Sequence, residues 1–176
     1  MKATGIIRRI DELGRIVIPK EIRKSLRIKE GENLEIFVDN NDNIVLKKYS
    51  AIKKLDDLAQ ELTESINSFV KKNVIITDND TILAASGAFK KNLLSKPISD
   101  ELESKILRRE ELLERHSKTL SLTLNEEIEA TYTVSPIIVS GDTVGLVMIF
   151  SSKEIVDETD FKLVQILSKF LNNHLE

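Results

Sequence analysis

The chain is 176 residues long, 41% hydrophobic and 31% charged, a composition typical of a soluble globular protein with one large or two small domains. It has no cysteine, which excludes disulfides and thiolate metal sites, and it shows neither an apolar signal core nor the roughly 18 apolar residues that span a membrane. The net charge of −3 is unevenly divided, because residues 1–50 carry 11 Lys and Arg against 8 Asp and Glu, whereas residues 51–176 carry 15 against 21.

This division predicts a basic module at residues 1–50, a connecting helix at 51–72 that belongs to a second domain, and the body of that acidic domain at 73–176. A basic module beside an acidic one indicates different partners for the two, since a basic surface attracts polyanions. The composition also predicts a cytoplasmic protein with no membrane partner.

The first module begins with a hairpin and a helix. Residues 4–10 alternate as a β-strand does. Gly14 fits a turn that requires φ > 0, ahead of a short apolar strand at 16–18. Pro19 suits the first position of the following helix, because its φ is already fixed and its missing N–H is not needed there.

The helix after Pro19 carries two stripes of opposite character. Its basic face, at i, i+3, i+4 and i+7, consists of Lys20, Arg23, Lys24 and Arg27. Ile22 and Leu26 form a separate apolar stripe. Arg15, one strand upstream, lies beside the basic face if the strand packs on the helix. The pattern fits an anionic partner such as nucleic acid, although a solvated surface helix shows the same pattern.

A second hairpin completes the module. Strands are predicted at 34–38 and 44–49, on either side of a turn at 40–43. About fifty residues cannot bury a convincing core alone, and no disulfide or set of metal ligands compensates here. We therefore predict a homodimer, whose symmetry would present two matched basic surfaces.

Residues 1–28, with Gly14, Arg15 and Pro19 in frame, and the second hairpin together resemble the AbrB family of bacterial transition-state regulators. The resemblance implies a swapped-hairpin β-barrel dimer that grips double-stranded DNA. The DNA-contacting positions of the family fall here on Arg8, Arg15, Arg23 and Lys24. The other basic residues of the same surface are Arg9, Lys20 and Arg27.

Lys24 stands where the family often has arginine. A lysine keeps the charge but loses the bidentate fork, so we expect it to contact phosphate rather than a base. Together with its second domain, the whole chain resembles the sporulation-type regulators of endospore-forming bacteria. That resemblance implies the forespore as the place of action.

Apolar residues recur at spacings of three and four through the connecting helix. They are Ile52, Leu55, Ala59, Leu62, Ile66 and Phe69. This spacing is typical of helices that pair with other helices, but three heptads are short for a free coiled coil, and the helix could equally pack on its own domain. If it pairs, the oligomerisation surface consists of Ile52, Leu55, Leu62, Ile66 and Phe69. Two kinds of interface used together would then close a homotetramer.

The acidic domain mixes strands and helices. Strands are predicted at 73–78, 81–85, 119–124, 130–139 and 143–150. One helix is predicted from its cap Ser99 to about residue 115, with Leu107 and Leu113 among its inward residues, and another begins after the cap Asp157. Residues 140–142 are a hairpin signal. This order resembles a GAF domain.

The GAF resemblance implies an α/β sandwich with a central antiparallel sheet, so the fold class of the whole chain is α+β. Domains of this kind typically sense small molecules in a pocket between the sheet and its covering helices. Here the places to look are Thr133, Ser135, Val147 and residues 87–94. The effector itself stays unidentified.

Candidate catalytic and metal-binding groups are few. His116 and His174 lack a second ligand at zinc spacing. The Asp78–Asp80 segment lacks the length, glycine and terminal glutamate of a calcium loop. No nucleophile elbow accompanies His116. We expect no metal, no cofactor, no catalytic residue and no enzyme activity.

Three classes of function remain. The first is a DNA-binding transcription regulator whose second domain senses a small molecule, builds a tetramer, or does both. The second is an AbrB-like antitoxin, which usually carries a disordered toxin-wrapping tail, whereas residues 51–176 show apolar periodicity throughout. The third is a ligand-sensing scaffold without DNA binding, which the basic first module disfavours. The first class fits the sequence best.

Overall fold

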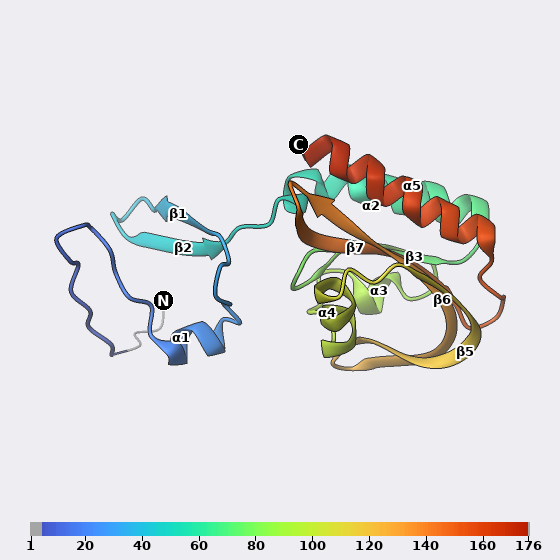
Figure 1. Cartoon of the computed structure of the whole chain (residues 1–176), viewed down its shortest axis with the longest axis horizontal. Helices are drawn as coiled ribbons and strands as arrows, with labels where there is room; N and C mark the ends of the chain where they lie inside the picture. The colour runs from blue at the N-terminus through green and yellow to red at the C-terminus, as the bar shows by residue number, and fades with distance from the viewer. Residues whose placement is uncertain (1–4, 176) are drawn as a thin grey trace. The chain divides into compact units, whose positions relative to one another are not determined.

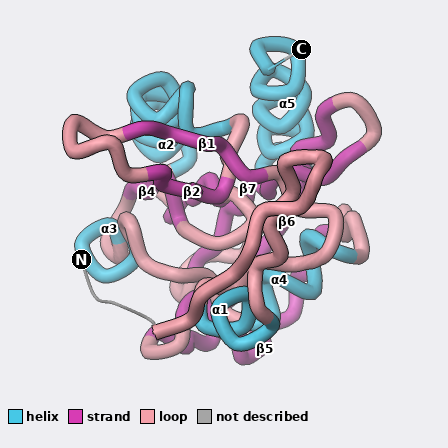
Figure 2. The backbone as a smooth tube through the Cα atoms, turned by 90° about the vertical axis from the view of Figure 1, so that its left-hand side faces the viewer, coloured by secondary structure: helices cyan, strands magenta, loops and turns pink. Residues whose placement is uncertain are grey.

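The computed structural model describes residues 5–175 and divides into two compact units, Met1–Tyr49 and Ser50–Glu176. The N-terminal unit contains helix α1 (Lys20–Ser25) and strands β1 (Leu34–Val38) and β2 (Ile44–Lys48). The strands pair antiparallel, with Leu34 opposite Lys48 and Val38 opposite Ile44. Figures 1 and 2 show the rest of this unit's described chain as loop.

The two strands predicted at 4–10 and 16–18 are not formed within one chain. The described residues 5–10 and 16–18 belong to no strand, and Thr4 lies outside the described residues. The physical reason is the lack of a partner surface, because Ile7 is 91% exposed and Val17 is 71% exposed. An apolar hairpin that faces solvent in one chain is the surface that a second chain would cover in a swapped dimer.

The turn between these segments is formed as predicted. Gly14 has a φ of +75°, in the region that glycine enters without steric strain. Its N–H donates to Asp11 O, and Asp11 N–H donates to Arg15 O, both at 3.0 Å. The tip of the first hairpin is therefore closed locally even though neither arm forms a strand.

Helix α1 is shorter than predicted at both ends. Pro19 has φ −58° and ψ 147°, so it precedes the helix instead of occupying its first position. At the other end, Arg27 has a left-handed φ of 52°. The N–H groups of Arg27 and Ile28 donate back to Lys24 O and Arg23 O at 3.2 and 2.8 Å. This pair of hydrogen bonds closes the helix, so Arg27 leaves the helical face predicted for it.

The C-terminal unit is built on one five-stranded antiparallel sheet in the order β4-β3-β7-β6-β5. Its strands are β3 (Asn73–Thr77), β4 (Ile82–Ser86), β5 (Leu112–Thr123), β6 (Glu126–Val139) and β7 (Asp142–Ser151). Its helices are the 3-10 turn η1 (Ile52–Leu55), α2 (Asp56–Val70), α3 (Lys90–Leu93), α4 (Asp100–Leu107) and α5 (Glu158–Leu175). Helices α2 and α5 cover one face of the sheet and α3 and α4 the other (Figure 1). The predicted α+β class with a central antiparallel sheet is confirmed.

Alternation along the central strands fills two apolar cores. In β7, Val147 and Ile149 belong to the core under α2 and α5, whereas Met148 and Phe150 belong to the core under α3 and α4. All four side chains are fully buried. The C-terminal unit can therefore fold around its own apolar side chains, with no second chain needed to cover the sheet.

Both predicted helix caps are formed. Ser99 Oγ accepts a hydrogen bond from Leu102 N–H at 3.2 Å at the start of α4. Asp157 Oδ1 accepts from the N–H groups of Thr159 and Asp160 at 2.8 and 3.1 Å at the start of α5. Each cap satisfies donors that have no partner inside the helix.

The helix predicted to reach residue 115 ends at Leu107 instead. Arg109 adopts a left-handed φ of 52°, and the chain then enters β5 at Leu112, well before the strand predicted at 119–124. Leu107 is 68% exposed and does not face inward. Consecutive charged residues and a register irregularity in β5 obscure the strand alternation in the sequence.

A buried ion pair ties the start of α5 to the body of the C-terminal unit. Lys72 Nζ lies 2.6 Å from Asp160 Oδ2, and the two side chains are 9% and 1% exposed. Asp157 N–H donates to the same carboxylate oxygen at 2.9 Å. Because an unpaired buried charge is strongly destabilising, this pair fixes where α5 meets the sheet.

Candidate nucleic-acid interface

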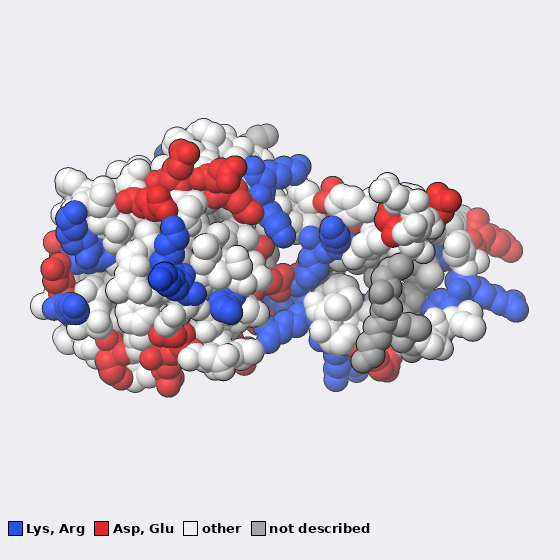
Figure 3. Space-filling model, turned by 180° about the vertical axis from the view of Figure 1, so that it is seen from behind, with Lys and Arg blue, Asp and Glu red and all other residues white. Residues whose placement is uncertain are grey.

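The basic residues predicted to contact DNA all lie on the N-terminal unit. Arg8 and Arg9 stand in the extended segment before the first turn, Arg15 directly follows the turn, and Arg27 follows α1. Helix α1 itself carries Lys20, Arg23 and Lys24. Arg23 is half-buried and the other six are exposed. In Figure 3, Lys and Arg side chains project from this unit.

Arg15 is the most firmly held of these side chains. Its Nε donates to Asp11 Oδ2 at 2.7 Å. The other carboxylate oxygen, Asp11 Oδ1, accepts from the backbone N–H groups of Leu13 and Arg15 at 3.0 and 2.8 Å. Hydrogen bonds from the Arg15 N–H and then from its guanidinium lower the pKa of Asp11, so this carboxylate is ionised at neutral pH.

The N-terminal unit has no core of its own. Among its described residues 5–49, Pro19 alone is buried. Its exposed large apolar side chains are Ile6, Ile7, Ile10, Leu13, Ile16, Val17, Leu26, Ile36, Phe37, Val38, Ile44, Leu46 and Tyr49. So much exposed apolar surface in a soluble domain indicates an interface, since monomers rarely leave large apolar patches in water.

The predicted oligomerisation stripe is only partly exposed. Ile52 is fully buried in the core under α2 and α5, and Leu55, Leu62 and Ile66 pack partly buried against that core. Phe69, at the end of α2, is 75% exposed. The sequence did not single out Ile166 of the neighbouring helix α5, which is 65% exposed.

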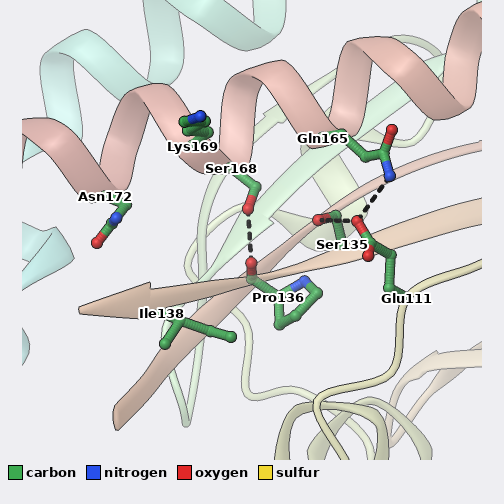
Figure 4. A pocket seen from close by; sticks show the side chains of 8 residues that line it. All are labelled: Glu111, Ser135, Pro136, Ile138, Gln165, Ser168, Lys169 and Asn172. Carbon is green, nitrogen blue, oxygen red and sulfur yellow. Dashed lines mark hydrogen bonds between the residues drawn. The ribbon is translucent and has the colours of Figure 1, made fainter. Parts of the chain in front are cut away.

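The C-terminal unit has a shallow pocket between α5 and the end of β6, with a volume of about 330 Å³ (Figure 4). Its lining residues are Glu111, Ser135, Pro136, Ile138, Gln165, Ser168, Lys169 and Asn172. Glu111 Oε1 accepts from Ser135 Oγ at 3.2 Å and from Gln165 Nε2 at 3.0 Å. Asn172 Oδ1 is buried without a hydrogen-bond partner. Among the lining side chains, Lys169 contributes an exposed ammonium group.

Of the residues predicted to line a pocket, Ser135 alone lines this one. Thr133 and Val147 are fully buried, and Thr133 Oγ1 donates to Leu112 O at 2.9 Å. Residues 87–94 form α3 and its approach on the opposite face of the sheet. The lining residues on α5 escaped prediction because a polar helix flank looks the same in sequence whether it faces solvent or a groove.

On that opposite face, a buried lysine occupies the layer between α4 and the sheet. Lys105 Nζ donates to Glu110 Oε1 at 2.9 Å and to Tyr132 Oη at 3.0 Å. Burial alone would lower the pKa of Lys105, but the Tyr132 and Glu110 hydrogen bonds raise it. The ammonium is thus charged and already satisfied by protein groups.

Within residues 5–175 no group of three or more His, Asp or Glu side chains is arranged to hold a metal ion. His116 Nδ1 lies 3.3 Å from Glu114 Oε1 on the exposed part of β5. The ring of His174 packs against the ring of Phe170 at the end of α5. No helix in this part of the chain is long and apolar enough to cross a membrane.

These features define a two-part regulator, in which a small basic unit that needs a partner chain is joined to a self-sufficient GAF-type sandwich. A family model described as stage V sporulation protein T C-terminal, transcription factor, matches residues 54–176. Stage V sporulation protein T of Bacillus subtilis (strain 168) is 45% identical over 178 positions, which cover 100% of this chain and 99% of that protein. The chain belongs to the stage V sporulation protein T family, whose C-terminal model is described as that of a transcription factor.

Two further matches describe the units separately. The transition state regulatory protein AbrB of Bacillus subtilis (strain 168) is 59% identical over 49 residues, 28% of this chain and 50% of that protein. A model described as antidote-toxin recognition MazE, bacterial antitoxin, matches residues 7–54. The phycocyanobilin-bound GAF domain of a cyanobacterial phytochrome shares the fold over 69% of this chain and 84% of its own, with 14% identity and a TM-score of 0.50. The predicted resemblances to AbrB and to GAF domains are confirmed.

Proposed function

We propose that this transcription factor binds double-stranded DNA as a dimer of its N-terminal unit, with Arg8, Arg15, Arg23 and Lys24 making most of the contacts. The proposal rests on two kinds of surface that occur together on the N-terminal unit. Exposed apolar side chains require a second chain to cover them, and exposed basic side chains favour an anionic partner. The 59% identity to AbrB over this unit supports it. Arg9, Lys20 and Arg27 add to the positive field around these contacts.

The antitoxin alternative fits the C-terminal unit poorly. The antitoxin model matches residues 7–54 only, whereas residues 50–175 form a sandwich with two buried cores. A toxin-wrapping tail would instead be a segment that orders on binding. A ligand-sensing scaffold without DNA binding leaves the basic N-terminal unit without a role. We place the regulator in the bacterial cytoplasm and, as the finer part of the proposal, in the forespore.

We propose further that the C-terminal unit joins two dimers into a tetramer through the outer surface of α2 and α5. These helices lie side by side (Figure 1), and each exposes a large apolar side chain, Phe69 on α2 and Ile166 on α5. Leu62 and Ile66, which precede Phe69 in α2, are half-buried against the core of their own unit. Ile52 is buried in the core under α2 and α5. The surface available for pairing is therefore smaller than the predicted stripe, which included Ile52.

The C-terminal unit is also proposed to sense a small molecule, in the pocket between α5 and β6. An anionic group of the ligand would pair with the exposed Lys169 at the rim of the pocket. Because the pocket spans a helix and a strand, a ligand could change how α5 sits on the sheet. Sensing requires the ligand to bind two arrangements of the protein with different affinity.

DNA binding through phosphate contacts predicts a defined response to salt. Arg15→Ala removes two contacts from a symmetric dimer, so the slope of log affinity against log salt should become shallower by about 1.8. Arg23→Ala should act in the same direction. The measurement is a DNA-binding titration at several salt concentrations, with Lys153→Ala on the C-terminal unit as the charge-matched control. An unchanged slope in both arginine variants would show that these residues do not contact DNA.

The tetramer proposal predicts that Phe69→Asp or Ile166→Asp reduces the particle from four chains to two in sedimentation velocity. Both side chains are exposed, so the substitution should leave the fold intact while a buried unpaired charge weakens the interface. Leu107→Asp is the matched control, because Leu107 is 68% exposed on the opposite face of the sheet. A wild-type particle of two chains, or variants of wild-type size, would contradict the proposal.

The sensing proposal predicts that some compound in a metabolite library raises the melting temperature of the protein. A ligand at a hundred times its Kd stabilises the native state by about 2.7 kcal/mol. Lys169→Ala should abolish the stabilisation and Lys162→Ala, on the same helix, should preserve it. If a compound still stabilises the Lys169→Ala variant, this pocket is not the ligand site. If no compound in the library raises the melting temperature, and substitutions in the pocket leave regulation normal, the pocket does not sense a ligand.

A further inference from the structure

Asp11 makes three hydrogen bonds through its carboxylate at the tip of the first hairpin. Oδ1 accepts the backbone N–H groups of Leu13 and Arg15 at 3.0 and 2.8 Å. Oδ2 accepts Arg15 Nε at 2.7 Å. One oxygen thus shapes the turn, and the other binds the arginine side chain. The two roles fall on different atoms of one residue.

The bond to Nε determines how Arg15 presents its charge. A guanidinium is planar and rigid, so a hydrogen bond at Nε fixes the plane of the whole group. The two terminal nitrogens then remain available at the end of a side chain that is 72% exposed. Their N–H groups match two oxygens of a phosphate, or O6 and N7 of a guanine, as a bidentate donor.

We propose that Asp11 is a positioning residue of the DNA interface, which holds Arg15 by Nε so that the terminal nitrogens of its guanidinium meet the DNA end-on. This inference rests on the proposed DNA binding and adds to it a residue of the opposite charge. Pre-ordering lowers the side-chain entropy that Arg15 would otherwise lose on binding. A carboxylate on a DNA-binding surface is otherwise unfavourable, because it repels phosphate.

Because of that repulsion, the two possible roles of Asp11 predict opposite changes in DNA affinity when its charge is removed. If Asp11 acts only through its charge, Asp11→Asn removes a repulsion and DNA binding becomes tighter. If Asp11 positions Arg15, the same substitution weakens binding. Asparagine keeps an oxygen that can accept the two backbone N–H groups of the turn, and it is well suited to such turns, but it lacks the second carboxylate oxygen. The variant therefore separates the arginine role from the turn role.

The experiment is a DNA-binding titration of the full-length protein and four variants at one low salt concentration. We expect Asp11→Asn to weaken binding about tenfold, because a symmetric dimer loses two ordered arginines. Glu12→Gln is the matched control: Glu12 is exposed, occupies the same loop and bonds to no arginine in the described structure, so its loss should leave binding equal or tighter. Arg15→Ala should weaken binding at least as much as Asp11→Asn.

The double variant Asp11→Asn/Arg15→Ala should bind like Arg15→Ala, since Asp11 acts through Arg15. Wild-type melting temperature and sedimentation in Asp11→Asn establish that the turn and the particle are intact. A variant that misfolds is replaced by Asp11→Ser, for which the same losses are expected. Asp11→Asn binding equal to or tighter than wild type, while Arg15→Ala is weakened, would overturn the positioning role alone. Absence of DNA binding in the wild-type protein would overturn the proposed function, and this inference with it.

Discussion

The N-terminal unit cannot bury its apolar side chains within one chain, and this constraint governs how that unit folds and how it presents its basic side chains. Pro19 is the one buried residue among the described residues 5–49, whereas the C-terminal unit buries two full cores around its sheet. A fifty-residue unit of this kind gains stability mainly by association. We therefore infer that dimerisation is a condition of folding for the DNA-binding part, in which symmetry would supply two equivalent basic surfaces.

The same constraint explains how the basic side chains are held. Without a core beneath them, they depend on hydrogen bonds that are local in sequence. The carboxylate of Asp11 closes its turn and orients Arg15, and the bonds that end α1 place Arg27 off the helix. The C-terminal unit has the opposite character: its ion pair between Lys72 and Asp160 joins residues far apart in the chain. Local hydrogen bonds thus hold the N-terminal unit, whereas contacts between distant parts of the chain hold the C-terminal unit.

Much of this could be predicted from the sequence where a local signal decides the structure. The helix caps Ser99 and Asp157 and the turn at Ser140-Gly141, with φ of 49° and 88°, are examples. The sequence failed where tertiary context decides. The start of β5 resembles a helix in sequence because charged side chains mask its alternation. The first hairpin has strand-like residues but no strand, since pairing needs a second chain. The pocket beside Asn172 and the contact of Asp11 with Arg15 depend on geometry that spacing does not encode.

Denaturant unfolding of the fragment 1–50 at several protein concentrations shows whether the N-terminal unit folds only as a dimer. For a dimer that unfolds to free chains, a tenfold rise in protein concentration adds about 1.4 kcal/mol to the apparent stability. We expect an unfolding midpoint that moves to higher denaturant as the fragment is concentrated. A cooperative unfolding transition with the same midpoint at every concentration would show that one chain folds alone and that the N-terminal unit does not need a partner chain to fold.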